Sequence, residues 1–193
     1  MPRLHWEDFS PGQITDCGSR LVTREEIIDF AAQYDPQPMH LDEQAARATL
    51  LGGLVASGWH SCCILMRMLS DGFLGEASFM GAPGVEEVKW LAPVRPDERI
   101  KARATVLETR PSRSRPDMGF VKFRFELIDT SDKPLMTLIV SPMFGRRAGA
   151  LASEASGQRG HSIGARAGHS PEPGSSARAD AAQGAERDAP NRS

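Results

Sequence analysis

One segment of the chain, residues 58–69, is apolar on nearly every side of the helix that it is predicted to form. Ser57 precedes it and is a suitable N-cap. Only three of its residues are polar or charged: His60, Ser61 and Arg67. A helix with so little polar surface is typically buried in a domain core. The rest of the chain must therefore supply a layer that covers this helix.

Strands after this helix can provide that layer. Residues 100–106 and 121–127 alternate apolar and polar side chains, which is typical of strands with one packed face and one wet face. Residues 85–91 and 135–144 are predicted as two further strands. The loops between them are short enough for antiparallel connections. We therefore expect an α+β domain whose antiparallel sheet curls around one central helix.

Two shorter helices are predicted ahead of the central one. Thr23 and Glu26 form a capping box, and apolar residues then recur at helical spacing, which predicts a helix over 24–34. Asp42 is a good N-cap for a second helix over 43–49. The sequence thus places a helical half before a half made of strands.

The composition changes at residue 148. Residues 148–193 are rich in Ala, Gly, Ser, Arg, Pro and Glu, with one Leu, one Ile and no aromatic residue. Such a segment cannot bury enough apolar surface to offset the entropy lost on ordering. We therefore predict one folded domain over 1–147 and a disordered low-complexity tail over 148–193.

Charge and composition argue against several classes of function. The net charge of -2 gives no basic field for nucleic acid, and no apolar run is long enough to span a membrane. The first nine residues lack the apolar core of a signal peptide, so a cytoplasmic protein is expected. Three cysteines, Cys17, Cys62 and Cys63, suit neither a disulfide framework nor a zinc site, and are predicted to be buried, reduced thiols.

The loop between the two short helices carries the candidate chemistry. Pro36 and Pro38 stiffen this loop, which can hold Asp35 and His40 toward a common point. A fixed carboxylate and imidazole can bind a water molecule and move its protons, because histidine titrates near neutral pH. The alternative is structural: Asp35 would be a turn residue and His40 a capping or core histidine. The spacing alone leaves both open.

A glycine-rich turn over 52–58 leads directly into the central helix. The N-terminus of a helix offers unpaired N–H groups and a partial positive charge. Gly58 would let a ligand oxygen approach closely, so its N–H is a candidate donor to a carbonyl oxygen. The alternative is that the glycines only permit a tight turn and Ser57 only caps the helix.

Three motifs in this order resemble those of the MaoC-like (R)-specific enoyl-CoA hydratases. They are Asp35-Pro-Gln-Pro-Met-His40-Leu-Asp42, Val55-Ala-Ser-Gly58 and Leu91-Ala-Pro-Val94-Arg-Pro-Asp97. The opening over 6–12 is also similar, so the resemblance covers roughly residues 6–146. It implies a hot-dog fold, in which an antiparallel sheet wraps a long helix. It also implies a homodimer with the substrate tunnel near the subunit interface, which would hide an exposed edge strand.

The same resemblance implies a hydro-lyase that adds water to a trans-2-enoyl-CoA, or removes it from an (R)-3-hydroxyacyl-CoA. Coenzyme A is then part of the substrate, and neither a metal nor another cofactor takes part. The family's catalytic aspartate and histidine fall on Asp35 and His40. Its carbonyl-polarising glycine falls on Gly58, whose N–H bond should strengthen as negative charge develops on the oxygen.

The sequence departs from the family at two positions. Gln37 stands where asparagine is usual, and Ser57 stands where histidine is usual. Both are candidate substrate-binding residues that can alter the polarity of the pocket, together with Trp59. Trp59 and Trp90 are expected to be core or pocket-wall residues. His60 is expected to be a hydrogen-bonded wall residue.

The basic residues near predicted loops and strand ends are candidates for binding the phosphates of coenzyme A. They are Lys89, Arg95, Arg110, Arg113 and Arg115. A solvated basic loop is at least as good an interpretation.

Two other functions stay open. A hot-dog thioesterase would share the fold and the thioester, but the central helix has no carboxylate before Asp71. A non-catalytic acyl-CoA-binding module would not require Asp35, His40 and Gly58 together.

Overall fold

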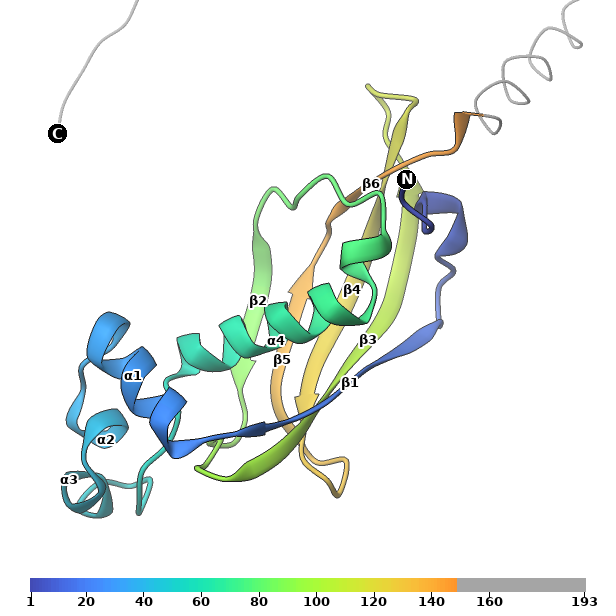
Figure 1. The fold of residues 1–193 in the computed structure, drawn as a ribbon. Helices are drawn as coiled ribbons and strands as arrows, with labels where there is room; N and C mark the ends of the chain where they lie inside the picture. Colours follow the sequence, from blue (N-terminus) through green and yellow to red (C-terminus); the bar gives the residue numbers. More distant parts are fainter. Residues whose placement is uncertain (149–193) are drawn as a thin grey trace, which may run out of the picture.

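The structure is a computed structural model that describes residues 1–148. Helix α4 (Gly58–Gly72) crosses one antiparallel sheet, and three short helices lie together at one end of α4 (Figure 1). The expected α+β hot-dog domain, with a sheet around a central helix, is confirmed. The tail predicted over 148–193 lies, after residue 148, outside the described residues.

The described sheet contains six strands, and all neighbouring strands run antiparallel. They are β1 (Ile14–Val22), β2 (Val85–Trp90), β3 (Glu98–Pro111), β4 (Met118–Ile128), β5 (Pro134–Val140) and β6 (Met143–Gly145). Their order is β1-β3-β4-β5-β2, while β6 pairs with the start of β4. Strands β1 and β2 are therefore the two edges of the sheet over residues 1–148.

Two features of the sheet differ from the sequence prediction. Strand β1 was not predicted, because the bulge between Asp16 and Ser19 and the positive φ of Gly18 interrupt its alternation. The single strand predicted over 135–144 was wrong: it divides into β5 and β6 around Pro142. Proline has no N–H for the ladder, so the chain leaves β5 there and pairs differently afterwards.

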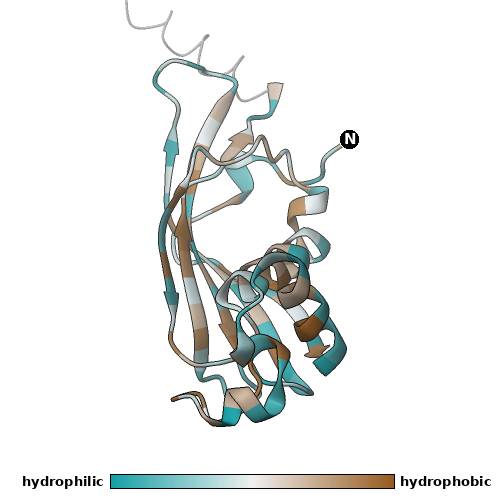
Figure 2. Ribbon diagram, turned by 90° about the vertical axis from the view of Figure 1, so that its left-hand side faces the viewer, coloured by the Kyte–Doolittle hydropathy of each residue, from teal (hydrophilic) through white to brown (hydrophobic). Residues whose placement is uncertain are grey.

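Sheet and helices form two layers, with the helices on one face of the sheet only (Figure 2). The core lies between these layers. At its centre Phe123, 2% exposed, contacts four other aromatic rings: Phe9, Phe73, Phe125 and Phe144. Such clusters contribute both buried apolar area and favourable ring geometry.

Helix α4 is buried on one side and exposed on the other. Its inner face carries Ile64, Leu65, Met68 and Leu69, each at most 5% exposed. Trp59, Cys63 and Met66 form an exposed stripe at helical spacing. The expectation that all three cysteines are buried was therefore wrong for Cys63, and Cys62 is only half-buried. One sheet covers only one side of a helix, and the stripe lies on the other.

The short helices are α1 (Arg24–Tyr34), α2 (Pro38–Leu41) and α3 (Glu43–Arg47). The capping box of α1 is present, with Glu26 N donating to Thr23 Oγ1 at 3.2 Å. Asp42 caps α3 as predicted, but α3 ends two residues before the predicted residue 49. Helix α2 was not predicted. Pro38 opens it at the first helical position, where a missing N–H costs nothing.

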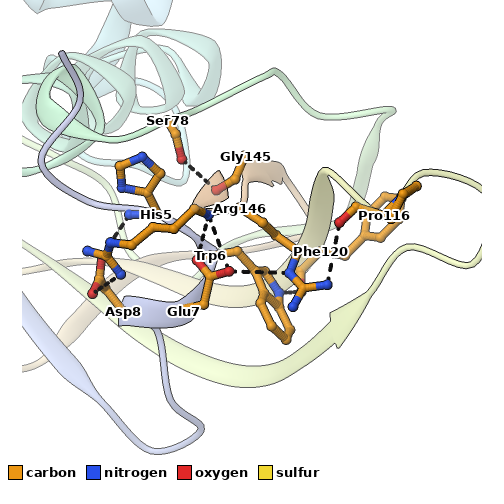
Figure 3. Close-up of polar contacts among 10 residues, drawn as sticks. His5, Trp6, Glu7, Asp8, Ser78, Pro116, Phe120, Gly145 and Arg146 are labelled. Atoms are coloured by element: carbon orange, nitrogen blue, oxygen red, sulfur yellow. Dashed lines mark hydrogen bonds and ion pairs between the residues drawn. The ribbon is translucent and has the colours of Figure 1, made fainter. Parts of the chain in front are cut away.

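The two ends of the described domain meet beside the β3–β4 hairpin (Figure 3). Trp6 Nε1 donates to the Phe120 carbonyl at 3.1 Å. Arg146 pairs with Glu7 at 3.3 Å, and Arg147 binds both carboxylate oxygens of Asp8 at 2.9 and 2.6 Å. We refer to Trp6, Glu7, Asp8, Arg146 and Arg147 as the terminal clamp. These contacts hold the first turn of the chain against the residues that directly follow β6.

No helix within residues 1–148 is both long and apolar enough to cross a bilayer.

Candidate active site

A cleft of about 450 Å³ opens at the N-terminus of α4. One side is formed by the loop between α1 and α2, and the other by the segment that follows β2. Its polar lining includes Asp35, Gln37, His40 and Ser61, while the remaining lining is largely apolar. A mostly apolar cleft with a few converging polar groups is the usual form of a small-molecule site.

Asp35 is held at the C-terminal end of α1, where its N–H donates to the Ala31 carbonyl at 3.0 Å. Ser57 Oγ donates to one carboxylate oxygen, Oδ2, at 2.6 Å. Gln37 Nε2 donates to the other, Oδ1, at 2.7 Å. The bond from Ser57, then that from Gln37, keeps the pKa of Asp35 below its usual value, although partial burial opposes this. Asp35 is therefore ionised at neutral pH.

His40 is buried on α2 and faces Asp35. Its Nδ1 lies 2.8 Å from the Val55 carbonyl oxygen. A carbonyl only accepts, so Nδ1 carries the proton of the neutral ring and Nε2 is left as an acceptor. Nε2 lies 3.6 Å from Asp35 Oδ2, beyond direct hydrogen bonding. In the neutral form of the ring, two acceptors face each other, and one water molecule can bridge them by donating a proton to each.

Ser57 joins the helix to the carboxylate. It is the N-cap of α4: its Oγ accepts from Trp59 N at 3.2 Å and donates to Asp35. Gly58 follows as the first residue of the helix and lines the cleft. The N–H of such a residue has no acceptor within its own helix. The Asp35–His40 pair and an available helix N–H therefore meet in one cleft.

The structure brings together the residues that the sequence selected. Asp35, Gln37, His40, Gly58 and Trp59 all line the cleft. Ser57, expected as a substrate-binding residue, does not line it: its side chain is buried and bonds Asp35. Sequence reasoning did not identify the segment over 91–94 as a wall, although the structure places all four of its residues on the cleft. The signal was present as a short apolar run at the end of the predicted strand over 85–91.

The basic candidates are not all near the cleft. Arg110, Arg113 and Arg115 lie on the β3–β4 hairpin, at the end of the sheet away from the short helices (Figure 1). Arg95 lies beside the cleft, where its Nη2 donates to the Leu51 carbonyl at 2.8 Å. Lys89 pairs with Glu87 at 2.7 Å. Within residues 1–148, no group of three or more His, Cys, Asp or Glu is arranged to hold a metal ion.

His60 does not line the cleft. It is buried between α4 and α1, with its ring stacked on Phe30 at 4.6 Å between centroids. The expectation of a hydrogen-bonded histidine is wrong for Nδ1, which is buried without a partner among the described residues. Burial lowers the pKa of His60 to about 4, with Arg20 contributing, so the ring is neutral and packs as an aromatic group.

Replacing Ser57 by Ala should raise the pKa of Asp35 toward its usual value, because the bond from Ser57 makes the largest contribution to lowering it. The carboxylate is ionised above this pKa and is protonated as the pH falls through it, so protonation should begin at a higher pH in the variant. Titration of the Asp35 carboxyl carbon by NMR measures this shift. Ser61→Ala is the matched control, because Ser61 lines the cleft but bonds the Ser57 carbonyl, not Asp35. An unchanged pKa of Asp35 in Ser57→Ala would contradict this role.

Comparison with known proteins identifies relatives of this chain. The family model described as "MaoC like domain" matches residues 9–121. The crystal structure of the MaoC-like dehydratase from Rhodospirillum rubrum is 37% identical, with a TM-score of 0.71, over 75% of this chain and 98% of that chain. The uncharacterized protein YdeM of Bacillus subtilis is 30% identical over 109 residues, which are 56% of this chain and 77% of YdeM.

A more distant structure shares the fold. The R-hydratase PhaJ1 from Pseudomonas aeruginosa is 18% identical, with a TM-score of 0.60, over 75% of this chain and 87% of that chain. At this identity the likeness concerns the arrangement of helix and sheet only.

Proposed function

This chain belongs to the MaoC-like domain family, and we propose that it is a hydro-lyase that adds water to the double bond of a trans-2-enoyl thioester or removes it. The similarity to the Rhodospirillum rubrum MaoC-like dehydratase supports this reaction class. We propose coenzyme A as the carrier of the acyl group. The product of hydration is then an (R)-3-hydroxyacyl-CoA.

One observation carries the proposal. Asp35 Oδ2 and His40 Nε2, both acceptors, face each other across 3.6 Å in a cleft that Gly58 also lines. This arrangement suits a water molecule held between a carboxylate and a neutral imidazole, with a helix N–H available to the carbonyl of the same substrate.

The charges of the two groups suggest their roles. Asp35 is a weak base, because two hydrogen bonds keep its pKa low. We therefore assign proton acceptance to His40 Nε2 and orientation of the water to Asp35. As the water oxygen bonds C3 of the substrate, its proton passes to Nε2. The imidazolium formed is stabilised by the adjacent carboxylate and returns a proton to C2, so that one water is added overall.

The carbonyl oxygen of the thioester would accept from the Gly58 N–H. Attack at C3 moves electron density onto this oxygen, so the bond strengthens as the reaction proceeds. The dipole of α4 acts in the same direction, because its N-terminus is the positive end. In this scheme the chain's own residues supply the proton carrier and the donor, and we propose that no further cofactor takes part.

We also propose that the protein acts as a homodimer. The exposed stripe of α4, which includes Trp59 and Met66, lies beside Trp90 at the end of edge strand β2. An unpaired edge next to exposed apolar side chains suits pairing with a second copy. That copy would also cover the mouth of the cleft. Analytical ultracentrifugation should find a dimer at micromolar concentration, and a monomer alone would contradict this proposal.

The reaction is tested with purified protein and crotonyl-CoA. Hydration removes the conjugated enoyl-thioester absorbance, and chiral analysis identifies the alcohol. Loss of absorbance with an (R)-3-hydroxy product and no free thiol is the expected result. Release of free coenzyme A without hydration would show that the protein is a thioesterase instead. No reaction with short, medium or branched enoyl-CoAs would favour a non-catalytic binding module.

A further inference from the structure

The indole of Trp90 lies directly against the first residue of α4. Its Nε1 donates to the Gly58 carbonyl oxygen at 2.9 Å. A Cβ atom at Gly58 would lie 2.6 Å from Cε2 of this indole and 2.8 Å from its Nε1. Contacts this short do not occur in proteins. The indole can therefore lie at this position only because Gly58 has no side chain.

The contact lies at the end of the helix that the proposed reaction uses. Cβ bonds in a helix tilt toward its N-terminus, so an indole that occupies the Cβ position of Gly58 lies beside the free N–H groups. Trp59 packs edge-on against the same indole, with centroids 5.6 Å apart and an interplanar angle of 76°. Both tryptophans line the cleft.

The other end of Trp90 belongs to the sheet. Trp90 is the last residue of β2, and its backbone pairs with Met136 of β5. Trp90 therefore connects the sheet to the first turn of α4 through one hydrogen bond and one close packing contact. Ser57 also fixes this turn, through its bond to Asp35. Gly58 is thus fixed by two contacts, one through the preceding Ser57 to Asp35 and one from its own carbonyl to Trp90.

We propose that Trp90 is a positioning residue that aims the Gly58 N–H at the substrate carbonyl. This assignment rests on the proposed function. A displacement of about 1 Å at a reacting centre can reduce a rate about a hundredfold, so a fixed first turn matters for turnover. The bond from Gly58 N–H is stronger in the transition state than in the bound substrate. Loosening it should therefore reduce kcat more than it changes KM.

The test uses crotonyl-CoA with four variants. Trp90→Phe keeps a ring on Gly58 but removes the Nε1 donor, and Trp90→Leu removes the ring. Gly58→Ala keeps the N–H but displaces the indole. Gly58→Ala combined with Trp90→Leu removes the clash. Leu21→Ala is the control, because Leu21 is an exposed apolar residue on the opposite edge strand, β1.

We expect Trp90→Leu and Gly58→Ala each to lower kcat by about tenfold to a hundredfold, with KM changed much less. The kcat of Trp90→Phe should lie between that of Trp90→Leu and that of the wild type. The double variant should be faster than Gly58→Ala alone, because removing the indole also removes the clash. Thermal unfolding of each variant gives its stability, and Trp90→Phe preserves the test where Trp90→Leu does not fold.

Three outcomes would overturn the assignment. Unchanged kcat in Trp90→Phe and Gly58→Ala would show that the N–H is held without the indole. A raised KM with unchanged kcat would make Trp90 a substrate contact and not a positioning residue. A wild type that hydrates no enoyl-CoA would overturn the proposed function as well, whereas an active wild type with unaffected variants would overturn this assignment alone.

Discussion

Replacing Asp35 by Asn is expected to lower kcat for crotonyl-CoA hydration by about 10²- to 10⁴-fold, the range typical of positioned proton-transfer groups. The amide is neutral, so it no longer stabilises the imidazolium that His40 forms. His40→Ala should have an effect of similar size, because it removes the proton acceptor. Steady-state kinetics of both variants measures these losses. Circular dichroism should show an unchanged fold, because neither change leaves a cavity in the phenylalanine core.

Asp42→Asn is the matched control for this prediction. Asp42 belongs to the same loop region, but its carboxylate caps α3 by accepting from Ala45 N at 2.7 Å. Asparagine is an equally good N-cap, so both the fold and the rate should be kept. Near-normal hydration by Asp35→Asn or His40→Ala would show that the assigned roles are wrong.

The largest effect on stability is expected from Phe123→Ala. Phe123 is 2% exposed and contacts the rings of four other phenylalanines. Removing a buried phenylalanine ring costs about 3–5 kcal/mol, through lost transfer free energy and the cavity left behind. Small domains are stable by about 5–15 kcal/mol in total, so much of the free energy of unfolding would be lost. Urea unfolding of the two proteins gives the difference.

Phe79→Ala provides the comparison. Phe79 is 40% exposed and contacts Phe144 edge-on at the margin of the same cluster. Its ring is partly in water, so a much smaller loss is expected. Equal losses in the two variants would contradict the assignment of Phe123 to the centre of the core.

The periodicity of apolar residues predicted the helices and strands that bury one regular face. The alternation over 100–106 and 121–127 became β3 and β4, and the capping box at Thr23 marked the start of α1. β1 was missed because its bulge changes which residues face inward halfway along the strand. The exposed stripe of α4 was missed for a different reason. Apolar composition does not say which side of a helix the sheet will cover.

The site was predicted as a set of residues but not as a set of contacts. Ser57 was noted as a departure from the family, and the structure makes it a donor to Asp35. Gln37, the other departure, donates to the second carboxylate oxygen. The contact between Trp90 and Gly58 joins residues 32 positions apart, from an edge strand and a helix end. No local pattern in a sequence records such a pairing.

The terminal clamp has a consequence for how the chain can be cut and rejoined. Residues 6–8 and 146–147 are in contact at the end of the sheet away from Asp35 (Figures 1 and 3). The two ends of the described domain therefore lie next to each other. A short peptide can join these ends without crossing the cleft. New ends then fit at the exposed turn over 129–133, between β4 and β5. Circular permutation at that turn would keep every contact of the cleft, because the site depends on spatial neighbours and not on the order in which the elements are connected.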